Sequence, residues 1–63
     1  MIDIQIEFLN DARPLRVEKI SRVPIVGERL ISMPYEVYEV QQVNHILRPA
    51  FDQVAAVVLV EVL

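Results

Sequence analysis

Hydrophobic and polar residues alternate regularly at the start of the chain. Within residues 1–9 the apolar and polar positions interleave one by one: Ile2, Ile4, Ile6 and Phe8 are separated by Asp3, Gln5 and Glu7. A period of two with β-branched residues is typical of a strand that buries one face. The pattern therefore predicts a strand over 1–9.

A second strand-like pattern runs through 35–47, a segment rich in valine and tyrosine. Its phase changes at Gln41–Gln42, and one extra residue at that point, a β-bulge, would explain the change. A helix is the alternative, because valines recur there every three residues. The β-branched and aromatic composition favours one long bent strand.

Three further strands are predicted, at 14–20, 29–33 and 54–63. The segment 14–23 also fits a short helix, because Pro14 suits the first turn of a helix as well as the start of a strand. In 54–63 the single charged residue is Glu61, which predicts that both faces of this strand are covered. Connections are expected at 23–28, which holds Pro24 and the sole glycine, Gly27, and at 48–53.

Five strands with short connections predict one all-β domain over 1–63. Two well-filled sheets would need more strands, whereas one long bent strand can serve both halves of a barrel. The expected architecture is therefore a small, closed, five-stranded antiparallel barrel.

The second half of the chain resembles a known group of proteins. The residues that carry the resemblance are Pro24-x-Val26-Gly27-Glu28, then Tyr38-x-Val40-x-x-Val43-x-His45, then the valine-rich end of the chain. Over residues 23–63 this pattern is similar to small uncharacterised bacterial and phage proteins with a Src-homology-3-like barrel, which tend to have Asp in place of Glu28. The resemblance implies a fold and no particular activity.

Composition narrows the possible roles. A chain of 63 residues without cysteine has little core and no disulfide, yet 54% of it is apolar, which predicts that some apolar side chains face another subunit. The net charge of −3 disfavours general binding to nucleic acid or to anionic membranes. No apolar run approaches the length of a membrane span, so a cytoplasmic protein is expected.

Catalytic chemistry has little support. With one histidine and no cysteine, a nucleophile–base pair would require Ser21 or Ser32 with His45, and one glycine cannot form a phosphate-binding loop. We therefore expect no enzyme, cofactor or metal site. His45 could be a pH-sensitive contact at a binding surface, or a half-buried strand residue bonded to a backbone carbonyl.

Two groups of residues are candidates for binding. Tyr35 and Tyr38 could form a recognition surface or belong to the barrel wall. We assign the candidate interaction set to Tyr35, Tyr38, His45, Val58 and Val60. The second group is a possible basic patch within 13–22, formed by Arg13, Arg16, Lys19 and Arg22. These four cations could equally be the solvated side chains of an edge strand. Glu36 and Glu39 are expected to be solvated.

The leading hypothesis is a non-enzymatic interaction or structural module that self-associates or binds a protein partner through strand edges. The alternative is a nucleic-acid-binding barrel that uses the basic segment 13–22.

Overall fold

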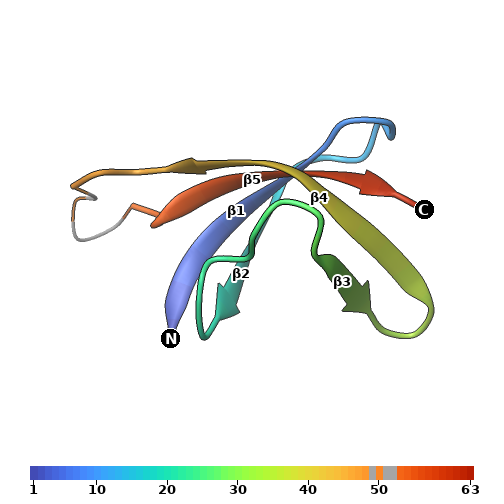
Figure 1. Cartoon of the computed structure of the whole chain (residues 1–63), viewed down its shortest axis with the longest axis horizontal. Coiled ribbons are helices and arrows are strands. Elements are labelled where there is room, and N and C mark those ends of the chain that lie inside the picture. Colours follow the sequence, from blue (N-terminus) through green and yellow to red (C-terminus); the bar gives the residue numbers. More distant parts are fainter. Residues whose placement is uncertain (49, 51–52) are drawn as a thin grey trace.

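The computed structural model describes residues 1–48, 50 and 53–63, and its regular elements are all β-strands (Figure 1). In chain order they are β1 (Ile2–Phe8), β2 (Arg16–Ile20), β3 (Arg29–Ser32), β4 (Glu36–His45) and β5 (Ala56–Val62). The all-β class and all five predicted strands are confirmed, and β2 shows that a strand occupies the ambiguous segment 14–23. No helix in the described part of the chain is long and apolar enough to cross a membrane. The predicted connection at 48–53 falls partly on residues 49, 51 and 52, which lie outside the described residues.

The strands form one sheet in the order β2-β1-β5-β4-β3. Three neighbouring pairs are antiparallel, but β1 and β5 are parallel, with Ile4 opposite Ala56 and Ile6 opposite Val58. The prediction of a purely antiparallel sheet was therefore wrong. The reason is geometric. Strand direction alternates along the chain, so β1 and β5, the first and the fifth strands, run in the same direction and are parallel where they pair.

The sheet curls into a half-barrel that is open on one side (Figure 1). A closed barrel of five strands would need a fifth pairing, between β2 and β3, and these two strands instead form the two ends of the sheet. The predicted closed barrel is thus corrected to an open one. We call the gap between β2 and β3 the seam.

A bulge in β4 allows the sheet to bend while its apolar face stays continuous. Val40 lies opposite Val60, but the next paired residue of β4 is Gln42, opposite Leu59, so Gln41 is an extra residue. After this insertion Val43 lies opposite Val58, on the same face as Val40. The predicted bulge at Gln41–Gln42 is confirmed.

The core lies on the concave face of the half-barrel. Its buried apolar side chains come from three adjacent strands and are Ile4, Ile6, Tyr38, Val40, Ala56, Val58 and Val60. Alternate residues of β5 belong to this core, while Val57 and Leu59 are half-buried on the convex face. Burying each core valine stabilises the fold by roughly 1.5–3 kcal/mol, which matters greatly in so small a domain.

The loop between β2 and β3 crosses the open side of the half-barrel (Figure 1). Pro24 is buried, and Gly27 has a φ of 90°, as expected for the sole glycine. A Cβ at Gly27 would meet no atom within 4 Å, so the requirement for glycine is conformational. The Gly27 amide donates to the Val40 carbonyl (2.8 Å), and the Val40 amide donates to the Glu28 carbonyl (2.9 Å).

We predict that Val58→Ala lowers the free energy of unfolding by about 2 kcal/mol, because it removes fully buried methyl groups from the centre of the core. Val57→Ala is the matched control on the opposite face of the same strand and should cost less than about 1 kcal/mol. Urea denaturation of both variants checks this. Equal losses would show that the two faces of β5 contribute alike.

Candidate interaction site at the seam

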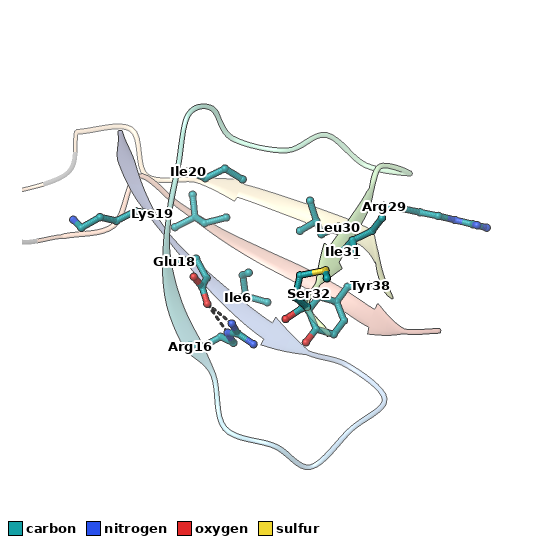
Figure 2. A pocket seen from close by; sticks show the side chains of 12 residues that line it. Ile6, Arg16, Glu18, Lys19, Ile20, Arg29, Leu30, Ile31, Ser32 and Tyr38 are labelled. Carbon is teal, nitrogen blue, oxygen red and sulfur yellow. Dashed lines mark hydrogen bonds and ion pairs between the residues drawn. The ribbon is translucent and has the colours of Figure 1, made fainter. Parts of the chain in front are cut away.

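The seam forms a groove of about 540 Å³ between the two ends of the sheet. Apolar side chains from both sides point into it, among them Ile6, Ile20, Leu30 and Tyr38 (Figure 2). Ile6 and Tyr38 are already buried at its floor, whereas Ile20 and Leu30 are half-buried walls. The accessible surface of the seam is therefore its two walls and the strand edges above them.

The two edges differ in charge. β2 carries three charged side chains in five residues, and Arg16 donates to Glu18 on the groove side of the strand (Figure 2). Charged side chains on an edge strand discourage another chain from pairing with it. β3 has a single charged residue, Arg29, in the sequence Arg-Leu-Ile-Ser. The β3 edge is therefore the less protected of the two.

Large apolar side chains are exposed along β3 and the turn that follows it. Ile31 is 73% exposed, Met33 80% and Tyr35 91%. Three such residues in one short segment exceed the scattered exposure that is normal on a protein surface. They place the most accessible apolar surface of the seam region beside the free β3 edge.

A polar cluster at one end of the half-barrel fixes Tyr38. The Arg13 guanidinium donates two parallel hydrogen bonds to Glu36, at 2.8 and 2.9 Å, and its Cζ lies 4.9 Å from the centre of the Phe8 ring. The Tyr38 hydroxyl donates to Glu36 Oε1 (2.8 Å), and the rings of Phe8 and Tyr38 meet edge to face at 5.2 Å. Asp11 also accepts from Arg13. The cluster ties the loop after β1 to the start of β4.

These contacts shift the ionisation of the carboxylates. The hydrogen bonds from Arg13, and then from Tyr38, hold the pKa of Glu36 below its usual range. Arg13 likewise lowers the pKa of Asp11 through its side-chain and backbone hydrogen bonds. Glu36, which we expected to be solvated, therefore forms a bidentate ion pair with Arg13.

The four cations of the predicted basic patch do not form one surface. Arg16 and Lys19 lie on opposite faces of β2, because Arg16 shares the face of Ile6 and Lys19 that of Asp3. Each of the four pairs with an acid, in the combinations Arg13–Glu36, Arg16–Glu18, Lys19–Asp3 and Arg22–Glu28. Their charge is compensated locally, so they offer little free positive potential for a polyanion.

The predicted interaction residues are dispersed in the same way. Tyr38 is 2% exposed in the core, whereas Tyr35 projects from the turn, so the two tyrosines do not share a surface. Val58 and Val60 are fully buried and inaccessible to a partner. A strand that is apolar on both faces does not reveal which face is the core, and the accessible positions are Val57 and Leu59. His45 is exposed at the end of β4, so the half-buried interpretation was wrong.

Three exposed residues that line the seam were not predicted from the sequence as site residues: Arg29, Ile31 and Met33. The available signal was the low charge of 29–33 compared with 14–20, but it acquires meaning only when both segments are known to be sheet ends. Among the described residues, no three metal-binding side chains come together.

No protein-family model matches the chain, and neither the curated proteins nor the solved structures contain a match to it.

We predict that the Arg13–Glu36 pair stabilises the fold above about pH 4.5 and less so below it. Because the folded-state pKa of Glu36 lies below its ordinary value of 4.5, the unfolded chain binds the proton first as the pH falls. The free energy of unfolding should therefore decline through this range, and Glu36→Gln should make the decline shallower. Denaturant titrations at a series of pH values measure it.

Glu7→Gln, on the convex face of β1, is the control for the pH experiment. It removes the same charge without touching the Arg13 cluster. If the two variants show the same pH dependence, the ion pair is not its source.

Proposed function

We propose that this protein is a non-enzymatic interaction module that binds an extended protein segment along the free edge of β3. The observation that carries the proposal is the open seam: one pairing of the barrel is missing, and it leaves a strand edge with a single charged residue, Arg29, beside exposed apolar side chains. An unpaired strand edge is a template for another strand, whose main chain supplies the hydrogen bonds and whose alternate side chains supply specificity.

The seam suits a strand better than a compact ligand. It is a groove bordered by two strands that run antiparallel to each other, so an added strand is antiparallel to one and parallel to the other. Antiparallel pairing is somewhat more stable per residue. The weakly charged β3 is therefore the antiparallel partner in this proposal.

The small size of the domain supports the same conclusion. Among the described residues the core has seven buried apolar side chains, which give limited stability. Binding to the folded state adds stability by mass action. The added strand can come from a second copy or from another protein. We retain a Src-homology-3-like barrel as the nearest description of the fold and a cytoplasmic location, both of which rest on the sequence pattern.

We predict that Ile31→Lys abolishes association, because it places a charge on the exposed apolar position of the β3 edge. Val17→Lys is the matched control, since Val17 is a 54%-exposed apolar residue on the other edge strand. The measurements are molar mass by light scattering and recovery of binding proteins from the native cell extract. Both variants should melt like the wild-type protein.

The proposal fails if Ile31→Lys retains the same molar mass and recovers the same proteins as the wild-type chain. It also fails if Val17→Lys alone loses them, because the interaction would then use β2.

A further inference from the structure

We infer that the segment bound by β3 is an acidic stretch of a different protein, with the pattern polar-apolar-apolar-acidic, running antiparallel to β3. This inference rests on the proposed function and adds to it the chemistry of the partner. It follows from the side chains on the two faces of β3. It also follows from the side chains of the edge strands in a second copy, which do not complement them.

The pairing that β3 already makes with β4 shows which residues suit its side chains. Glu36, Val37, Tyr38 and Glu39 of β4 lie opposite Ser32, Ile31, Leu30 and Arg29. Residues directly opposite in an antiparallel pair share a face and contact each other. A strand on the free side of β3 meets the same four side chains, so the same order of polar, apolar, apolar and acidic residues fits it.

Arg29 has the capacity for a second carboxylate. Its Nε lies 3.7 Å from Glu39 Oε2, a long contact, and its side chain is 67% exposed. Glu39 itself also accepts a hydrogen bond from Gln41 (2.9 Å) and lies opposite Glu61. Figure 2 shows the Arg29 side chain extending away from the groove. A guanidinium carries five N–H donors, and a single long contact leaves most of them available.

A second copy of the chain does not supply that carboxylate. Only β2 and β3 end the sheet, since β1, β4 and β5 each have two neighbours. On the face shared with Arg29, β2 offers Val17 and Lys19, and β3 offers Arg29 and Ile31. Lys19 opposite Arg29 would be repulsive. Glu18, the one acid on either edge strand, lies on the groove face and is paired with Arg16.

Charge complementarity therefore favours a foreign acidic strand over self-pairing. The remainder of the contact is neutral: an apolar residue packs beside Leu30 on the groove face and another beside Ile31 on the convex face.

The test uses the intact protein and two short synthetic peptides. The acidic peptide carries Glu-Val-Tyr-Glu between flanking serines, and the comparison peptide replaces the final Glu with Lys. Binding is measured by titration while the backbone amide signals of Leu30–Ser32 are followed by NMR. The protein variants are Arg29→Gln and Arg29→Glu, with Lys19→Gln and Lys19→Glu as controls that change the net charge equally on the other edge.

The acidic peptide should bind the wild-type protein on the order of fivefold more tightly than the lysine peptide, the scale of an exposed ion pair. Arg29→Gln should abolish this preference and Arg29→Glu should reverse it, while both Lys19 variants retain it. Arg29→Glu places a second carboxylate opposite Glu39 and could unfold the protein for that reason. In that case the neutral Arg29→Gln variant still tests the charge preference. The preference should also weaken as salt is added.

Equal binding of both peptides at β3 would overturn the acidic partner while leaving the proposed function intact. The wild-type protein could instead bind neither peptide and form a dimer that Ile31→Lys abolishes. That result would identify a second copy as the occupant and overturn the inference. Equal effects of the Arg29 and Lys19 variants would also overturn it, because net charge alone would then explain the preference.

Discussion

The parallel pairing of β1 with β5 is the contact on which the rest of the structure depends. The other pairings join strands that follow one another in the chain, so without this one the sheet would separate into the β1–β2 hairpin and the β3–β4–β5 meander. Neither piece could bury the face that carries Ile4 and Val58. Because the pairing closes nearly the whole chain into a loop, it also carries the largest entropic cost of any contact in the fold.

Backbone and side-chain groups extend this contact beyond the two strands. The Ala55 amide donates to the Asp3 carbonyl (2.8 Å) at one end, and the Leu9 amide donates to the Val60 carbonyl (2.9 Å) at the other. Asn10 then acts in place of a further peptide unit: its side chain donates to the Val62 carbonyl (3.0 Å) and accepts from the Val62 amide (2.9 Å). The Arg13 cluster starts three residues later, so the loop after β1 is fixed on both β5 and β4.

Sequence periodicity predicted the strands well because it reports a local property, the alternation of buried and exposed side chains. It identified the bulge for the same reason, since the phase of β4 changes within three residues. Pairing partners are not local, which is why the parallel contact and the open seam were missed. The faces of β5 were assigned wrongly because alternation is absent there: Val57, Val58, Leu59 and Val60 are all apolar, and only their neighbours decide which two are core.

The charged residues show the same limit. Clustering in sequence suggested a basic patch over 13–22, but successive residues of a strand point to opposite faces. Three of the four cations also have an acidic partner that only the fold brings close. Arg29 looked unremarkable in the sequence and is the cation with the weakest pairing on an edge strand. In a small sheet, the charges that point to a binding site are therefore those on an edge strand that have only a weak ion pair within the fold.

The open seam is a consequence of the loop that joins β2 to β3. The Gly27 amide and the Glu28 carbonyl form backbone hydrogen bonds with Val40 of β4, so the loop continues the β3–β4 ladder and draws β3 toward β4, away from β2. Arg22 and the Ile25 amide both bind the Glu28 side chain, and Pro24 is buried beneath them. Closing the seam within one chain would require this loop to exchange bonds to β4 for bonds to β2. An added strand on the free β3 edge, as proposed above, would leave all of these bonds in place.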